Sequence, residues 1–226
     1  MPRNSTTETD FLVLRKTDYS ETSLIIAGVT PDQGQLHFLG RGARRLGGKS
    51  FPVADLFRVL RLIYRPGKSD LYTWQNAEVV RDFSSLATDI NAYNAACWLA
   101  GFTLRNTAGD HPMPGFYGAL LLALERLQKA AAHHGEVEKY TMLIPVACVL
   151  MVYLDENGLL PDYRDKPDQR KRRDALLAAG EGKGEIPRVS SLTWKKLFNW
   201  QKRILEWNEC ALPPTGLLLH EREGRP

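Results

Sequence analysis

Three arginines within five residues are the side chains in this sequence best suited to binding chemistry. The stretch that holds them reads Leu39-Gly40-Arg41-Gly42-Ala43-Arg44-Arg45, with a glycine on each side of the first arginine. Glycine lets the backbone turn sharply, and each guanidinium presents a planar, permanently charged fork that matches phosphate oxygens. A basic run can also be an ordinary solvated turn. Other features of the sequence are needed to distinguish a phosphate-binding loop from a solvated turn.

Positive charge is concentrated in two blocks that are separated by an acidic middle. Residues 1–82 hold 12 Lys and Arg against 9 Asp and Glu, and residues 164–203 hold 12 against 5. Residues 83–163 hold only 4 against 8. Such an uneven distribution of charge along the chain gives information about the binding partner and not about the fold. A polyanion is the simplest partner that fits it.

We predict two basic surfaces that contact the phosphates of nucleic acid. The first surface consists of Arg41, Arg44, Arg45 and Lys49, with Arg15, Lys16, Arg65 and Lys68 as secondary members. The second surface consists of Arg170, Lys171, Arg172, Arg173, Lys195, Lys196, Lys202 and Arg203. Cations that neutralise phosphates lower the repulsion between two strands and leave the base edges free to pair. Two separate surfaces could therefore hold two strands at the same time.

The remaining reactive side chains do not combine into a catalytic or metal site. Cys97, Cys148 and Cys210 lie far apart in apolar or helical segments, so we predict reduced, buried cysteines and no zinc. His133 and His134 are adjacent and point in different directions, which favours solvent exposure. No combination of a nucleophile, a general base and a group that orients the base can be assigned from the sequence. Binding without a cofactor is therefore favoured over catalysis.

Short strands predict that the basic loop belongs to a small β-domain. Segments rich in β-branched and alternating apolar residues predict five strands, over residues 11–16, 22–30, 35–40, 57–64 and 71–80. A Pro-Asp-Gln-Gly turn at residues 31–34 joins the second strand to the third. This pattern predicts a five-stranded antiparallel barrel of the OB type over residues 1–82, after a disordered arm at residues 1–9.

Two aromatic residues of the fifth strand leave two roles open. Tyr72 and Trp74 are two positions apart and therefore face the same side of the strand. Either they stack on bases in a binding groove or they fill the barrel core. The core interpretation is favoured because large aromatic side chains supply much of the buried area of a small barrel.

Beyond Asp82 the hydrophobic period becomes that of helices. We predict helices over residues 86–103, 115–133, 137–156 and 193–210, with Ser191 as an N-cap and Gly158 as a C-cap. The first helix has an apolar face that carries Ile90, Tyr93, Cys97, Ala100 and Leu104. Residues 83–226 are expected to form a helical bundle domain, which makes the whole chain α+β. The pattern does not define the fold of a basic insert around residues 162–190.

Hydropathy argues against a membrane protein or an exported one. The longest apolar segments, residues 118–124 and 142–154, are too short or too interrupted to cross a bilayer. Residues 1–10 lack the apolar core of a signal peptide. We therefore expect a cytoplasmic protein, associated with the nucleoid if DNA is its partner.

The order of these features resembles the RecO family of DNA repair and recombination mediators. The resemblance is carried by residues 14–21, by the turn at residues 30–35 and by the basic loop at residues 40–45. It continues through residues 71–73 and 78–80 into the helical half. Members of that family have an OB fold followed by a helical domain, and some carry a four-cysteine zinc module after a stretch like residues 158–161. This chain has four consecutive basic residues and no cysteine in that region, so no zinc module is expected.

The resemblance implies a non-enzymatic mediator that binds single- and double-stranded DNA and anneals complementary strands. With RecR and single-stranded DNA-binding protein, such a mediator lets RecA load at gaps. The acidic, Phe-ended tail of single-stranded DNA-binding protein needs an apolar pocket with a basic rim, and residues 193–210 offer both ingredients. Two other classes stay open: an RNA-binding OB-fold protein of translation or RNA processing, and a hydrolase or transferase with a site built from scattered residues.

Overall fold

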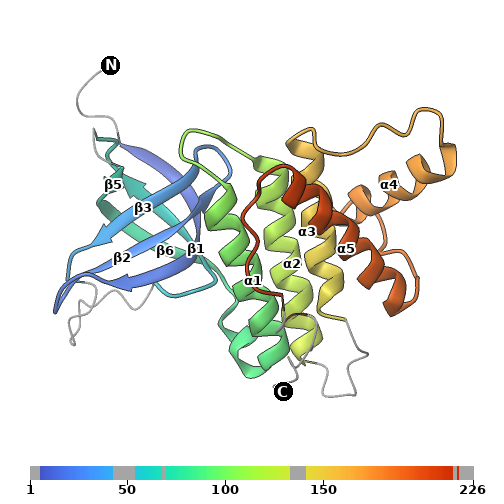
Figure 1. The fold of residues 1–226 in the computed structure, drawn as a ribbon. Coiled ribbons are helices and arrows are strands. Elements are labelled where there is room, and N and C mark those ends of the chain that lie inside the picture. Colours follow the sequence, from blue (N-terminus) through green and yellow to red (C-terminus); the bar gives the residue numbers. More distant parts are fainter. Residues whose placement is uncertain (1–5, 43–53, 68–69, 133–140, 216–217, 219–226) are drawn as a thin grey trace, which may run out of the picture. The chain divides into compact units, whose positions relative to one another are not determined.

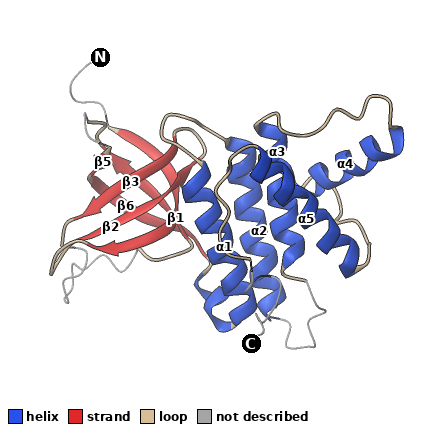
Figure 2. Ribbon diagram, in the orientation of Figure 1, coloured by secondary structure: helices blue, strands red, loops and turns tan. Residues whose placement is uncertain are grey.

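The computed structural model describes residues 6–42, 54–67, 70–132, 141–215 and 218 (Figure 1). The chain divides into two compact units. The first unit comprises residues 1–84 and 107–114, and the second comprises residues 85–106 and 115–226. Figure 2 shows that the first unit is made of strands and the second of helices. The fold class is α+β.

The first unit is a six-stranded mixed sheet with the strand order β5-β3-β2-β1-β4-β6. Its strands are β1 (Thr7–Asp18), β2 (Leu24–Thr30), β3 (Gly34–Gly40), β4 (Arg58–Tyr64), β5 (Leu71–Tyr72) and β6 (Trp74–Asp82). The pairing is antiparallel throughout, except that β3 and β5 run parallel. β5 and β6 stand at opposite ends of the strand order, yet only Thr73 separates them in the chain. The sheet therefore curves round until its two edge strands lie one residue apart in the chain.

The predicted set of five antiparallel strands was wrong in strand number and in one strand direction. The last predicted strand is divided at Thr73, because its start pairs with β3 and its continuation pairs with β4. A strand that passes from one edge of a curved sheet to the other has to change partners. The predicted disordered arm was also too long, since β1 begins at Thr7. Thr9 is buried and donates a hydrogen bond from its hydroxyl to Asp32, 2.7 Å away.

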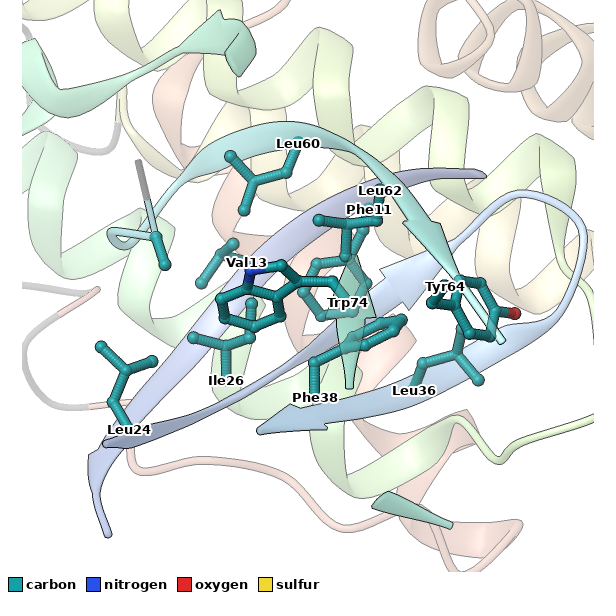
Figure 3. Close-up of a cluster of buried hydrophobic side chains, with 11 residues drawn as sticks. Phe11, Val13, Leu24, Ile26, Leu36, Phe38, Leu60, Leu62, Tyr64 and Trp74 are labelled. Carbon is teal, nitrogen blue, oxygen red and sulfur yellow. The ribbon is translucent and has the colours of Figure 1, made fainter. Parts of the chain in front are cut away.

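An aromatic cluster forms the core of the first unit (Figure 3). Phe38 lies at its centre and packs edge-on against the rings of Phe11 and Tyr64, with centroids 5.1 and 5.0 Å away. Trp74 is buried in the same cluster, and Tyr72 packs against it. This confirms the prediction that these two aromatic residues belong to the core. Trp74 supports the sheet from inside, and the half-buried Tyr72 covers the edge of the cluster.

The second unit contains five α-helices after a short 3-10 turn at Ser84–Thr88. They are α1 (Ile90–Asn106), α2 (Pro114–Ala132), α3 (Leu143–Glu156), α4 (Pro167–Gly180) and α5 (Ser191–Trp207). α3 is the most deeply buried of them, because eleven of its fourteen side chains are buried. The C-cap of α3 is Asn157 and not Gly158; Gly158 follows it with φ +67°, and the N–H groups of Gly158 and Leu159 bond to carbonyls of the last turn. The N-cap of α5 is Ser190 and not Ser191, since the Ser190 hydroxyl accepts from the Thr193 N–H.

The predicted apolar face of α1 was wrong in part. Ile90 and Cys97 are exposed, whereas the buried face carries four alanines, Ala100 among them, together with Trp98 and Phe102. The Trp98 and Phe102 rings stack 5.6 Å apart, and the Trp98 indole N–H donates to the Pro213 carbonyl. The alanines let another element approach closely, so the small side chains mark the buried face. Of the three cysteines that were predicted to be buried, Cys148 is buried, Cys210 is half-buried and Cys97 is exposed.

The basic insert contains a helix that the sequence did not define. α4 begins at Pro167, a residue that suits the first helical position because it has no N–H to leave unpaired. Its basic first half is largely exposed, and its last residues, Ala179 and Gly180, are buried. A side chain at Gly180 would lie 2.7 Å from the Cys148 carbonyl oxygen of α3. The glycine therefore lets the end of α4 pack directly on α3.

Candidate nucleic-acid interface

The first predicted surface falls partly on described residues. Arg41 is exposed directly after β3, Arg15 and Lys16 are exposed on β1, and Arg65 is exposed after β4. The other predicted members lie outside the described residues: Arg44, Arg45, Lys49 and Lys68. His133 and His134 also lie outside them.

Arg15 and His37 lie in one row across three neighbouring strands. Arg15 pairs with Ala27 of β2, and Ala27 pairs with His37 of β3. The next residues along β2 and β3, Ile26 and Phe38, belong to the core, so this row is on the outer face of the sheet. Burial lowers the pKa of His37, and the neighbouring Arg15 charge lowers it further. The Arg15 guanidinium therefore produces a positive potential on the outer face.

A shallow hollow of about 420 Å³ lies at the end of this surface. Its lining consists of Tyr19, Thr22, Ser23, Leu39, Arg41 and Gly42. The β1–β2 turn forms one wall and is held by hydrogen bonds from the Tyr19 and Ser20 N–H groups to the Ser23 carbonyl, at 3.1 and 3.2 Å. The hollow thus combines an aromatic ring, two hydroxyls and a guanidinium.

Tyr19 is the functional candidate that sequence reasoning missed. Its side chain is 62% exposed, which excludes the usual core role of an aromatic residue. One signal was present in the sequence, because the flanking residues Asp18, Ser20 and Glu21 are all polar. An aromatic ring in such a turn has no apolar residues next to it in the sequence.

The sheet also carries arginines whose charge is already balanced. Arg58 pairs with Asp82 at 3.0 Å, and Arg61 pairs with Asp10 at 3.1 Å and with Glu8 at 3.5 Å. Lys16 pairs with Asp55 at 2.7 Å; burial opposes the ionised form of Asp55, but bonds from Lys16 and the Leu56 N–H hold its pKa below the ordinary value. Within the described part of the chain, neither Arg15 nor Arg41 forms an ion pair. No described carboxylate therefore balances the charges of these two arginines.

The second predicted surface lies on two helices. Arg170, Lys171 and Arg172 are exposed on α4, and Arg173 is less exposed. Asp174 lies 2.7 Å from Arg173 and 3.9 Å from Arg170. One carboxylate therefore competes with phosphate for two of the four α4 cations.

The basic residues of α5 spread around that helix. Lys196 and Arg203 are exposed, and Lys195 and Lys202 are half-buried. The buried side of α5 carries Trp194, Phe198, Gln201 and Leu205. The structure brings α4 cations together with α5 at a pocket, but there α5 contributes Thr193, Trp194, Leu197 and Trp200, and not its lysines.

That pocket has a volume of about 400 Å³ and lies among α3, α4 and α5. Its walls are largely apolar, with Met151, Leu176 and Trp194 among them, and its lining also includes Arg172 and Arg173. Burial raises the pKa of Tyr163, another lining residue, while the Arg173 charge opposes that shift. The pocket suits a small apolar group that is attached to a negative charge.

The described residues contain no group of three or more His, Cys, Asp or Glu side chains that is placed to hold a metal ion. No helix among them has the length and apolarity needed to cross a membrane.

Comparison with known proteins relates residues 3–83 to the family described as "Recombination protein O N terminal". Three relatives named DNA repair protein RecO come from Rhodopirellula baltica, Gloeobacter violaceus and Bacillus subtilis. The identities are 29%, 32% and 25%, over 62%, 53% and 54% of this chain and 51%, 46% and 48% of each relative. The chain thus spans about half the length of the curated relatives it matches.

Proposed function

This chain belongs to the RecO family of DNA repair proteins, and from that premise we propose that it acts as a recombination mediator. It binds single- and double-stranded DNA, anneals complementary strands, and with RecR promotes loading of RecA. The observation that carries this proposal is the outer face of the first unit. Arg15 lies there and Arg41 lines the hollow that presents Tyr19, and neither arginine forms an ion pair with another described residue.

The sheet topology supports an OB-type assignment for the first unit. Counting β5 and β6 as one strand broken at Thr73 gives five strands that close on themselves. OB folds bind oligonucleotides along one face of the barrel with the help of neighbouring loops. The β1–β2 turn and the end of β3, which line the hollow, are positions of this kind.

Annealing follows from charge neutralisation without a catalytic group or cofactor. Guanidinium groups that contact phosphates release condensed counterions and reduce the repulsion between two backbones. Phosphate contacts leave the base edges free, so complementary strands can pair while both are bound. The α4 cations provide the second surface in this proposal. We expect a protein that works in the cytoplasm, at the nucleoid.

The pocket of the second unit is proposed to receive the acidic, Phe-ended tail of single-stranded DNA-binding protein. The apolar walls suit a phenyl ring, and the guanidinium groups of Arg172 and Arg173 suit carboxylates. This assignment can be tested with Val189→Asp, because Val189 lines the pocket and is 47% exposed. The variant should lose binding of an acidic Phe-ended peptide and keep its DNA affinity. Leu192→Asp, at an exposed position outside the lining, is the matched control.

The function itself is tested by titrating a fluorescent single-stranded oligonucleotide at several salt concentrations and following annealing of its complement in the same samples. About five phosphate contacts predict a log–log salt slope near −3.5 for single strands. Accelerated annealing together with such a slope would support the mediator. Weak, salt-insensitive binding without annealing would contradict it. Stronger competition by structured RNA than by single-stranded DNA would favour an RNA-binding protein instead.

A further inference from the structure

We propose that the hollow beside Tyr19 is a subsite for one unpaired nucleotide, and that it gives this protein a preference for single strands over duplex. The base stacks on the Tyr19 ring, and a flanking phosphate binds the Arg41 guanidinium. The proposal rests on the proposed DNA-binding function and adds to it which surface recognises the unpaired state.

Tyr19 is held in position although it is exposed. The backbone N–H groups of Tyr19 and Ser20 donate to the Ser23 carbonyl, and the Ser23 N–H donates to the Ser20 hydroxyl at 3.1 Å. These three bonds close the β1–β2 turn from both sides. The ring is therefore presented by a defined turn, which lowers the entropy cost of ordering it when a base stacks on it.

The rest of the hollow matches the chemistry of a nucleotide. Leu39 adds an apolar surface next to the ring, and the hydroxyls of Thr22 and Ser23 can donate to sugar or phosphate oxygens. Arg41 is exposed at the same edge and makes no ion pair within the described residues. The volume of about 420 Å³ falls in the range of small-ligand sites.

Stacking on Tyr19 requires a base with a free face. In duplex DNA each base is stacked on both sides and paired at its edge, so entry into the hollow would require it to leave the helix. Arg15, on the outer face of the sheet, contacts only phosphate and therefore serves both forms of DNA. The structure thus separates a general contact, Arg15, from a contact specific for unpaired bases, Tyr19.

The test compares Tyr19→Ala and Tyr19→Phe in the full chain, using a fluorescent oligo(dT) strand and a duplex of equal length. Tyr19→Ala should weaken single-strand binding about 5- to 20-fold, within the range found for base–aromatic stacking, and change duplex binding less than twofold. Tyr19→Phe keeps the ring and should retain the single-strand affinity. Because the tyrosine ring is uncharged, Tyr19→Ala should leave the salt slope unchanged, whereas Arg41→Gln should reduce it by about 0.7.

An abasic strand of the same length provides the second arm. Wild-type protein should bind it as weakly as Tyr19→Ala binds oligo(dT), and the substitution should cause no further loss on the abasic strand. Equal losses on single strand and duplex, no loss at all, or a Tyr19→Phe variant as weak as Tyr19→Ala would overturn the subsite. Failure of the wild-type protein to bind any DNA would instead remove the proposed function, so the two failures are distinguishable.

Discussion

The helical region around α4 and the strand region around β1–β3 both carry predicted phosphate contacts, but they use their charge differently. Residues 164–203 hold 12 cations against 5 acids, a larger excess than residues 1–82. Nevertheless, Asp174 engages both Arg170 and Arg173, whereas neither Arg15 nor Arg41 is paired within the described residues. We therefore expect the availability of a cation, and not the number of cations in a segment, to decide where phosphate binds.

The two regions also differ in the shape of the surface beside their cations. The strand region offers an open hollow with an exposed tyrosine, which suits a long polyanion that passes across it. The α4 arginines stand beside a pocket with apolar walls, which suits the end of a short acidic peptide. We therefore propose that similar arginine side chains recognise different partners because their surroundings differ.

The largest expected effect comes from removing the internal support of the strand region. Phe38→Ala should lower the free energy of unfolding by about 3–5 kcal/mol, because a fully buried ring is lost from the centre of the cluster. Single-strand binding should fall with it, since β3 carries the hollow. Phe38→Leu keeps a large apolar side chain and should lose less. Chemical denaturation followed by far-UV circular dichroism measures the stability of both variants. An unchanged stability of Phe38→Ala would contradict the described core.

The next effect compares arginines that form no ion pair within the described residues with arginines that pair with carboxylates. The double substitution Arg15→Gln with Arg41→Gln should weaken single-strand binding on the order of tenfold and reduce the salt slope by about 1.4, because two phosphate contacts are lost. The matched control, Arg58→Gln with Arg61→Gln, removes the same net charge from residues that pair with carboxylates. It should change affinity less than threefold. Equal losses in the two variants would mean that net charge alone governs binding, and the comparison would fail.

Local chemistry allowed part of the fold to be predicted from the sequence. The turn after β2 needs Gly34, which has φ +72° and whose side chain would meet the Ala108 carbonyl oxygen at 2.3 Å. The break at Thr73 was not predictable in this way, because it depends on which strands Tyr72 and Trp74 find beside them. The apolar face of α1 was misjudged because alanines contribute little to a hydrophobic pattern and yet allow the closest packing.

The candidate site was predicted less completely than the fold. The basic loop led to Arg41, but the sequence does not show that Arg61 meets Asp10, 51 positions away, or that Arg15 does not meet a similar partner. Such pairings depend on strand register, which is a tertiary property. Tyr19 was missed for a related reason, since exposure of an aromatic residue is known only when its surroundings are known.

A smaller effect tests whether the α4 arginines contribute to DNA binding. Asp174→Asn should raise single-strand affinity by at most about fivefold, because it frees Arg170 and Arg173 from an exposed ion pair worth about 0.2–1 kcal/mol. Asp162→Asn is the control, since Asp162 pairs with Arg164, which lies outside the predicted surface. Fluorescence titration at low salt measures both variants. An unchanged affinity in Asp174→Asn would remove α4 from the DNA interface and leave it to the peptide pocket.

The smallest effect concerns the potential that Arg15 produces at His37. Burial and the Arg15 charge lower the pKa of His37 below its ordinary value of 6.5. Above pH 6.5 neither the folded nor the unfolded state binds this proton, so His37 then adds no pH dependence. As the pH falls below 6.5 the unfolded state takes the proton first, and the free energy of unfolding decreases until the folded-state pKa is passed. Wild-type protein should therefore lose more thermal stability between pH 8 and pH 5 than His37→Gln does.

Arg15→Gln provides the decisive comparison for this last effect. It removes the second cause of the pKa shift and leaves the first, burial, in place. The acid-induced loss of stability should therefore become smaller than in wild type without disappearing. Melting temperatures of the three proteins across the pH range give the order directly. If Arg15→Gln and wild type lost the same stability, the Arg15 charge would not reach His37, and the outer face of the sheet would lack the potential that the proposed phosphate contact requires.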